Sequence, residues 1–210
     1  MQRIATYMAV KTGMEERYRQ EHEHIWPEVL EGITRFGVHS YSIFMHEREL
    51  YSYYEVEDLE KTGAMAAADP DNQRWQVHMA DFFDVGPGIQ DGSTVYPVEV
   101  FFAPGNEQLP PPLQRIGGLH RLKAGREGTV RQLCEAASPQ VYEAIRKAGI
   151  RKDCIYLVGQ MLFTYYQAQD PGRAHTLLVA DPAYRTWHAS LADCLERSTS
   201  ILMDEVFYVP

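Results

Sequence analysis

The chain has 210 residues, 45% of them hydrophobic and 23% charged, a globular composition that excludes collagenous, disordered and disulfide-rich classes. Its formal charge of -9 provides no basic surface for a phosphate backbone or for anionic lipid, so we expect neither nucleic acid nor membrane as a partner. The chain starts without an apolar signal segment, and its three cysteines form no disulfide or zinc pattern, so we expect a cytoplasmic protein.

Residues 1–104 predict the order strand, helix, strand, strand, helix, strand. The expected elements are a strand at 4–11, a helix at 14–36, strands at 38–46 and 50–57, a helix opening at Asp69-Pro70, and a strand at 98–102. Asp69 is a suitable helix cap, and Pro70 suits the first turn of a helix. This order is ferredoxin-like, with both helices on one face of an antiparallel sheet.

The helix expected at 14–36 carries a single stripe of mainly apolar residues. The stripe consists of Tyr18, His22, Ile25, Val29, Ile33 and Phe36, spaced by three or four positions. His22 is therefore expected on the face that packs on the sheet. Pro27 lies inside this segment and is expected to kink or to restart the helix, because proline removes a helical hydrogen bond. In the next strand, simple alternation places His39 and Tyr41 on the same face.

The second half of the chain repeats the first. Shifting the sequence onto itself by 112 positions aligns Arg3-Ile4 with Arg115-Ile116, Pro27 with Pro139, Leu50–Tyr54 with Leu162–Tyr166, and Trp75 with Trp187. After a six-residue shortening, Glu99–Pro104 aligns with Glu205–Pro210. Such extended self-similarity indicates two copies of one structural unit. We therefore predict repeats at 1–104 and 113–210, joined by a proline-rich linker at 105–112.

The strands expected at 50–57 and 98–102 carry apolar or aromatic residues on both faces. Helices cover only one face of each sheet, so the other face needs a different cover, and the equivalent sheet of the second half is the natural one. We therefore predict an α+β fold in which two tandem ferredoxin-like (βαββαβ) repeats form a pseudo-dimeric α+β barrel.

The second repeat serves as a control for the function of the first. Tyr18, His22, Trp26, His39 and Tyr41 are replaced there by Val130, Cys134, Ser138, Arg151 and Asp153, whereas the glycines, prolines and strand pattern persist. A histidine on an apolar stripe is usually a core residue, but this scaffold manages without it, which favours a chemical role for His22. Trp75 recurs as Trp187, so a structural role explains it.

Other motifs argue against a cofactor. The chain contains no dinucleotide-binding glycine motif, no phosphate-binding loop and no serine-hydrolase elbow. Glu21, His22, Glu23 and His24 resemble a metal cluster, but helical residues two apart point about 200° from each other and cannot chelate together. We expect Glu21, Glu23 and His24 to face solvent, and we expect neither metal nor cofactor.

The first half resembles the L-rhamnose mutarotase family, a group of small α+β barrel proteins. The matching motifs are Tyr18-x-x-x-His22-x-x-Ile25-Trp26-Pro27-Glu28, Gly37-x-His39-x-Tyr41, Gln73-Arg74-Trp75 and Glu99-Val100-Phe101-Phe102-x-Pro104. The resemblance implies an aldose mutarotase, an isomerase of carbohydrate metabolism that interconverts sugar anomers, with a small sugar as its substrate. It implies His22 as the acid/base residue, and we expect Tyr18, one helical turn earlier on the same face, to be catalytic as well, by orienting a hydroxyl or acting as the second proton carrier. The expected substrate-binding residues are Tyr41, Trp75, Gln76, Trp26 and His39.

Two departures from the family pattern concern specificity and assembly. The family typically has a second tryptophan where this chain has Gln76, and it forms homodimers of single units, which the fused chain replaces with an intramolecular pseudo-dimer that can pair further. The alternatives are a cofactor-independent cyclase, isomerase or oxygenase on the same type of barrel, or a non-catalytic binding protein.

Overall fold

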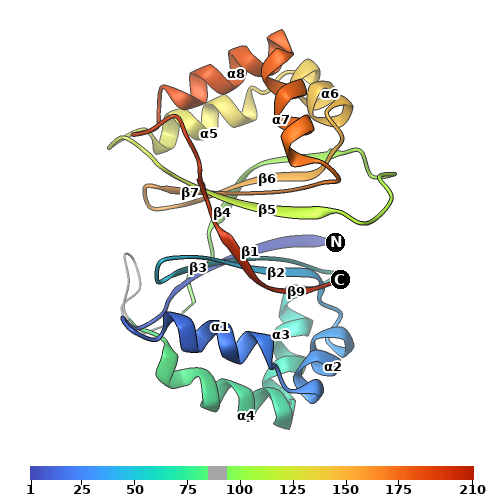
Figure 1. Ribbon diagram of the computed structural model, residues 1–210, viewed down its shortest axis with the longest axis vertical. Coiled ribbons are helices and arrows are strands. Elements are labelled where there is room, and N and C mark those ends of the chain that lie inside the picture. Colours follow the sequence, from blue (N-terminus) through green and yellow to red (C-terminus); the bar gives the residue numbers. More distant parts are fainter. Residues whose placement is uncertain (85–93) are drawn as a thin grey trace. The chain divides into compact units, whose positions relative to one another are not determined.

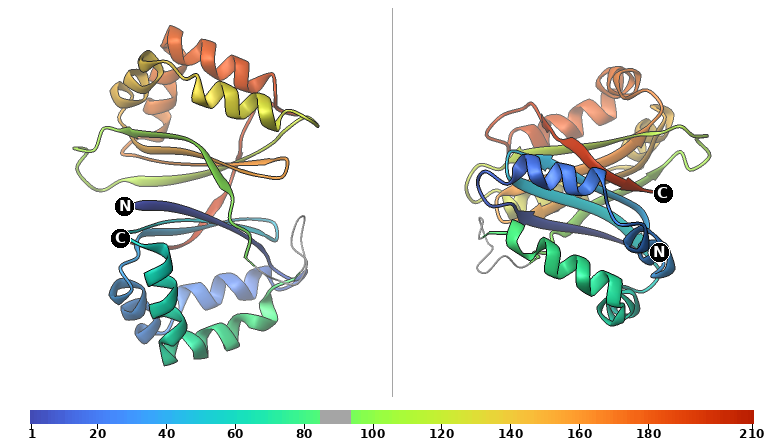
Figure 2. Two further views of the ribbon diagram at one scale, coloured as in Figure 1. Left: turned by 180° about the vertical axis from the view of Figure 1, so that it is seen from behind. Right: turned by 60° about the horizontal axis from the view of Figure 1, so that its bottom comes forward.

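A computed structural model describes residues 1–84 and 94–210 and divides the chain into two compact units (Figure 1). Unit 1 comprises Met1–Tyr96 with Asp204–Pro210, and unit 2 comprises Pro97–Met203. Within each unit, helices cover one face of an antiparallel sheet (Figures 1 and 2). The predicted α+β class with two repeated halves is confirmed.

The sheet of unit 1 has four strands in the order β1-β3-β2-β9. Its elements are β1 (Gln2–Ala9), α1 (Glu15–Glu23), α2 (Pro27–Arg35), β2 (His39–His46), β3 (Glu49–Val56), α3 (Leu59–Ala68), α4 (Pro70–Met79), the short 3₁₀ helix η1 (Ala80–Phe82) and β9 (Asp204–Val209). A hydrophobic core formed by Val29, Ile43, Met45, Trp75 and Met79, among others, joins these helices to the sheet.

The sheet of unit 2 has five strands in the order β4-β6-β7-β5-β8. Its elements are β4 (Val98–Gly105), β5 (Gln114–Arg121), α5 (Glu127–Glu135), α6 (Pro139–Lys147), β6 (Ile150–Val158), β7 (Met161–Ala168), α7 (Pro171–Ala180), α8 (Pro182–Ala192) and β8 (Ile201–Leu202). A second apolar core, which includes Val130, Val141, Ile145, Ile155 and Leu162, lies between sheet and helices.

The two repeats exchange their last strands. Phe101 of β4 lies opposite Ile155 in the sheet of unit 2, and Phe207 of β9 lies opposite Ile43 in the sheet of unit 1. The expectation that the strand at 98–102 completes the sheet of its own repeat is therefore wrong. Both closing strands carry the motif Glu-Val-Phe followed by an aromatic residue, and backbone hydrogen bonds at a sheet edge do not distinguish between them. The repeats seen in the sequence thus differ at their ends from the units that pack together.

Pro27 restarts the first helix rather than kinking it. The helix α1 ends at Glu23, and α2 begins at Pro27 after an extended Trp26 with φ -60° and ψ 133°. The residue before a proline favours this extended conformation, so the break follows from local sterics. The helix α3 is one that the sequence analysis did not predict, and Asp58 caps it by accepting a hydrogen bond from the Lys61 amide.

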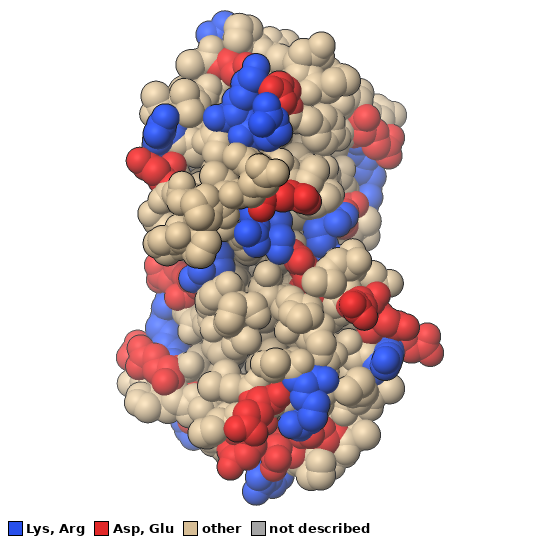
Figure 3. Space-filling model, turned by 90° about the vertical axis from the view of Figure 1, so that its right-hand side faces the viewer, with Lys and Arg blue, Asp and Glu red and all other residues tan. Residues whose placement is uncertain are grey.

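Charged side chains of both signs occupy the surface drawn in Figure 3. Blue Lys and Arg side chains are interspersed with red Asp and Glu side chains on that face. The negative net charge is thus not gathered into one area of this face. Over the described part of the chain, no helix combines the length and the apolar character that crossing a membrane requires.

Candidate functional site

A cavity of about 370 Å³ lies within unit 1, between its sheet and its helices. Side chains from β1, β2, β3 and all four α-helices line it. Its volume falls within the range of ordinary small-molecule sites. Of the residues predicted for the site, Tyr18, His22, Tyr41, Trp75 and Gln76 line this cavity, whereas Trp26 and His39 are not among its lining residues.

The tautomer and the protonation state of His22 follow from its place in α1. Its Nδ1 lies 3.0 Å from the backbone oxygen of Tyr18 one turn earlier. A carbonyl oxygen can only accept, so Nδ1 carries the hydrogen and, in the neutral ring, Nε2 keeps a free lone pair. Burial lowers the pKa of His22, opposed by the bond to the Tyr18 carbonyl and by the charge of Glu21. The imidazole is therefore predominantly neutral at pH 7.

Three aromatic side chains surround the His22 ring. Tyr18 stacks on it with ring centroids 4.1 Å apart, while Trp75 and Phe207 approach edge-on at 6.0 and 5.7 Å. This apolar enclosure accounts for the low pKa of the imidazole. Sequence reasoning missed Phe207 because its strand, β9, belongs to the second repeat. The only sequence signal for the placement of Phe207 was the closing motif, Glu-Val-Phe followed by an aromatic residue. This motif occurs in both repeats and fits either sheet equally well.

Phenol groups form the polar part of the cavity. Burial raises the pKa of Tyr18 well above its ordinary value and that of Tyr41 to about 12, and their proximity to other tyrosines adds to both shifts. Both phenols are therefore protonated at neutral pH and can donate hydrogen bonds. Tyr54, whose ring meets Tyr41 edge-on at 5.4 Å, also lines the cavity, and it recurs in the second repeat as Tyr166.

A bulge in β2 separates His39 from Tyr41. The pairing with β3 shifts register between His39 and Ser42, and Ser40 has a left-handed φ of 52°. An extra residue at this point breaks the alternation of the strand, so Tyr41 faces the cavity while His39 is exposed to solvent. The prediction that both side chains face the same way is therefore wrong.

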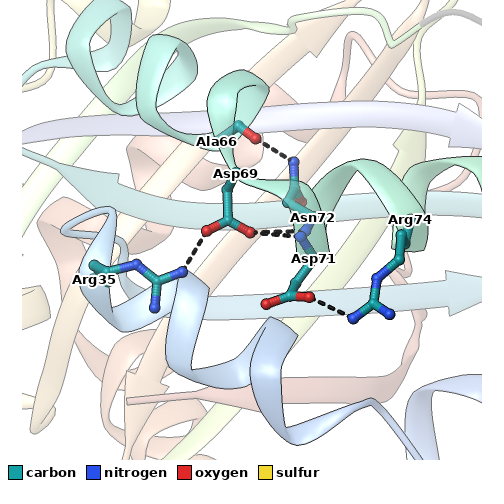
Figure 4. A network of polar contacts seen from close by, with 6 residues as sticks. All are labelled: Arg35, Ala66, Asp69, Asp71, Asn72 and Arg74. Carbon is teal, nitrogen blue, oxygen red and sulfur yellow. Dashed lines mark hydrogen bonds and ion pairs between the residues drawn. The ribbon is translucent and has the colours of Figure 1, made fainter.

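The position of Trp75 and Gln76 depends on the start of α4. Figure 4 shows Asp69 capping this helix: its carboxylate accepts hydrogen bonds from the Asp71 and Asn72 amides and pairs with Arg35 of α2. The Asn72 side chain donates to the Ala66 oxygen at 2.8 Å, which joins α4 to α3. The cap predicted at Asp69-Pro70 is thus confirmed.

Trp26 supports the cavity wall from behind. Its ring meets Trp75 edge-on at 5.3 Å, and the Arg74 guanidinium lies 5.9 Å from its centre. Trp26 therefore fixes the orientation of Trp75 instead of lining the cavity itself.

Glu21 pairs with a histidine that sequence reasoning missed. The Nε2 atom of His78 lies 2.7 Å from Glu21 Oε2, and the His78 ring packs against both Trp26 and Trp75. The expectation that Glu21 only faces solvent is therefore wrong. Among the residues with described positions, no group of three or more His, Cys, Asp or Glu side chains is placed to hold a metal ion.

Comparison with known proteins matches both repeats to one family. The family model described as L-rhamnose mutarotase matches residues 3–103 and again 115–209. An L-rhamnose mutarotase from Opitutus terrae is 42% identical over 89 residues, which is 41% of this chain and 85% of that protein. One from Bacillus subtilis is 43% identical over 82 residues, 38% of this chain and 78% of that protein.

A solved structure resembles the whole chain in fold. A protein from Fusobacterium nucleatum, provisionally named a monooxygenase, superposes with a TM-score of 0.59 at 7% identity, over 98% of this chain and 93% of that one. At this identity the likeness concerns the fold alone.

Proposed function

Because this chain belongs to the L-rhamnose mutarotase family, we propose that it interconverts the α and β anomers of L-rhamnose, or of a closely related aldose, in the cavity of unit 1. One observation carries the proposal. His22 has an unprotonated Nε2 in a cavity that the phenols of Tyr18 and Tyr41 also line.

The reaction needs one proton acceptor and one proton donor. Nε2 of His22 takes the proton of the anomeric hydroxyl while a phenol, from Tyr18 or Tyr41, gives a proton to the ring oxygen as the bond between that oxygen and the anomeric carbon breaks. The open aldehyde turns about its adjacent bond. The ring then closes on the other carbonyl face as both protons return. Positioned acid/base groups contribute about 10²- to 10⁴-fold, a substantial gain for a reaction that already proceeds in water.

The walls of the cavity suit a deoxysugar. Trp75 lines the cavity and offers apolar surface for a methyl group and for the apolar face of the ring, whereas Phe207 packs on the His22 ring and is not among the lining residues. Gln76 and Asn72 bring amide groups that donate to and accept from sugar hydroxyls. These residues bind and orient the sugar, whereas Trp26 acts through Trp75.

Anomer exchange of L-rhamnose, measured by saturation transfer between its anomeric proton signals, tests the proposal directly. We expect the wild-type chain to accelerate exchange and His22→Ala to abolish the acceleration. The matched control is His24→Ala: the His24 Nδ1 makes the same 3.0 Å contact with the backbone oxygen of Gln20, but its side chain is exposed. This variant should keep full activity.

The result that contradicts the proposal is a wild-type chain that leaves L-rhamnose and several other aldoses at their spontaneous rates. A cofactor-independent cyclase, isomerase or oxygenase, or a non-catalytic binding protein, would then be the better reading of the cavity.

A further inference from the structure

The second repeat builds the same frame around a different set of polar residues. In unit 1 the residues Met8, Tyr41, Tyr54, Asn72, Trp75 and Gln76 line the cavity. Their counterparts in unit 2 are His120, Asp153, Tyr166, Tyr184, Trp187 and His188. These six residues are called the second cluster below.

The counterparts occupy equivalent places because the two frames have the same register. Tyr54 pairs with Ile4, and Tyr166 pairs with Ile116. The bulge of β2 recurs in β6, where Lys152 has a left-handed φ of 57°. The cap of α4 recurs in α8, where the carboxylate of Asp181 accepts from two backbone amides. The second cluster therefore lies on the helix-facing side of its sheet, where Tyr166, Tyr184 and Trp187 also pack against the apolar core.

Electrostatic and ring contacts join the members of the second cluster. The pKa of Tyr166 is raised by burial and by the charge of Asp153, and the same two causes raise that of Tyr184. The Tyr184 ring stacks on His188 with centroids 5.7 Å apart and an interplanar angle of 19°. Burial lowers the pKa of His120, and the charge of His188 lowers it further. Carboxyl, phenol and imidazole groups thus meet in one place.

Two of these groups have no partner in the described part of the chain. Nδ1 of His120 is buried without a hydrogen bond, and the carboxyl of Asp153, a half-buried residue, has no hydrogen bond or ion pair with the described residues. Burial raises the pKa of Asp153 to about 7 and lowers that of His120 to about 4. Polar groups that leave water without new partners cost stability.

Packing alone does not explain this cost. Unit 1 builds the same frame with Met8 in the place of His120, so the scaffold accepts an apolar residue there. A buried imidazole nitrogen without a hydrogen bond, in the same frame as a carboxyl without a partner, is better explained by a ligand that supplies the missing hydrogen bonds.

We propose that the second cluster is a second binding site, and that its ligand is an uncharged polyhydroxylated molecule, an aldose or a related polyol. Asp153 accepts hydrogen bonds from hydroxyl groups when ionised and donates one when protonated, while Tyr166 and Tyr184 each offer a phenol. The indole nitrogen of Trp187 already donates to the Leu133 oxygen at 3.0 Å, so this residue offers its ring as apolar surface. Burial keeps His120 and His188 neutral, which disfavours an anionic ligand.

The three indole N–H signals of the chain allow an NMR test in the intact protein, because Trp187 reports on unit 2 while Trp26 and Trp75 report on unit 1. The probes are L-rhamnose, D-galactose, D-xylose and xylitol, with inorganic phosphate as the charged comparison. We expect at least one of the four uncharged probes to shift the Trp187 signal in a saturable way. We expect the isosteric variant Asp153→Asn, and independently Tyr184→Phe, to weaken that binding about tenfold.

Two controls separate this site from the cavity of unit 1. His22→Ala should leave the Trp187 titration unchanged, and Glu143→Gln, on the exposed surface of α6, should also leave it unchanged. The proposal is overturned if no probe, or phosphate alone, shifts Trp187 saturably, or if both cluster variants bind as tightly as the wild type. Loss of the Trp187 response in His22→Ala would overturn it too. None of these readouts depends on anomer exchange in unit 1.

Discussion

At the scale of single residues, environment separates His22 from His24. Both rings bond through Nδ1 to the carbonyl one turn earlier, but only His22 lies among Tyr18, Trp75 and Phe207. The shared bond selects one tautomer, and the aromatic enclosure then keeps that ring neutral. A helix turn and a buried face are together enough to hold this imidazole neutral, with Nε2 unprotonated, at pH 7.

This environment predicts a pH profile. A base must be unprotonated, and burial lowers the pKa of His22 below 6.5, so the catalysed exchange rate should rise with pH through a midpoint below 6.5 and then stay level to pH 9. The upper limit lies far away, because the pKa of Tyr41 is about 12. Exchange measured between pH 4.5 and 9, corrected for the spontaneous rate, checks this. A midpoint above pH 6.5 would contradict the assignment of the base.

Asp153 predicts an unusual dependence of stability on pH. The pKa of its carboxyl rises from 3.8 to about 7 on folding. Between these values the unfolded chain loses the proton while the folded chain keeps it, so this group lowers the free energy of unfolding as pH rises. Asp153→Asn should therefore be more stable than the wild type by about 2 kcal/mol at pH 8, and the difference should shrink towards pH 4. Urea unfolding at both pH values measures this, and an equal effect at both would contradict it.

At the scale of elements, capping residues stabilise the first turns of helices and so position the side chains that follow. Asp69 fixes the first turn of α4, one turn before Trp75 and Gln76, and Asp181 does the same for α8. Both carboxylates accept from two backbone amides, but Asp69 also pairs with Arg35, and of the two helices only α4 borders the cavity of unit 1.

Replacing each cap separates stability from function. Asp69→Ala and Asp181→Ala should each lower the free energy of unfolding by about 1 kcal/mol, through the loss of two capping hydrogen bonds. Only Asp69→Ala should also raise the KM for L-rhamnose, because Trp75 and Gln76 shift with the helix. Thermal unfolding and exchange kinetics give the two readouts. Equal kinetics in both variants would show that the cap has no part in positioning the cavity wall.

At the scale of the whole molecule, strand exchange makes the two repeats interdependent. Phe207, near the end of the chain, packs against His22 and Tyr41 in unit 1, whereas its counterpart Phe101 packs against Tyr142 and Trp187 in unit 2. A residue of the second repeat, Phe207, therefore packs on two side chains that line the cavity of unit 1. Neither repeat, cut at the boundary that its sequence suggests, retains all of its own contacts.

The exchange of closing strands between the repeats predicts that the two phenylalanines differ in their effect on activity. Phe207→Ala and Phe101→Ala should each destabilise the chain by about 3 kcal/mol, because each leaves a cavity in an aromatic cluster. At a temperature where both variants remain folded, Phe207→Ala should impair L-rhamnose exchange while Phe101→Ala leaves it intact. The reverse outcome would mean that each strand stays in its own repeat.

The sequence by itself determined the repeat, the order of most elements, the cap at Asp69 and the cavity-facing placement of Tyr18 and His22. These features follow from local propensity and from helical periodicity, which a single segment carries within itself. Only the tertiary structure decided that β4 and β9 change sheets, that a bulge turns His39 away from Tyr41, and that His78 pairs with Glu21. Two closing strands with one motif are equivalent partners for either sheet edge, and a pairing between distant helices leaves no periodic trace in the chain. Both are therefore settled only when the elements pack.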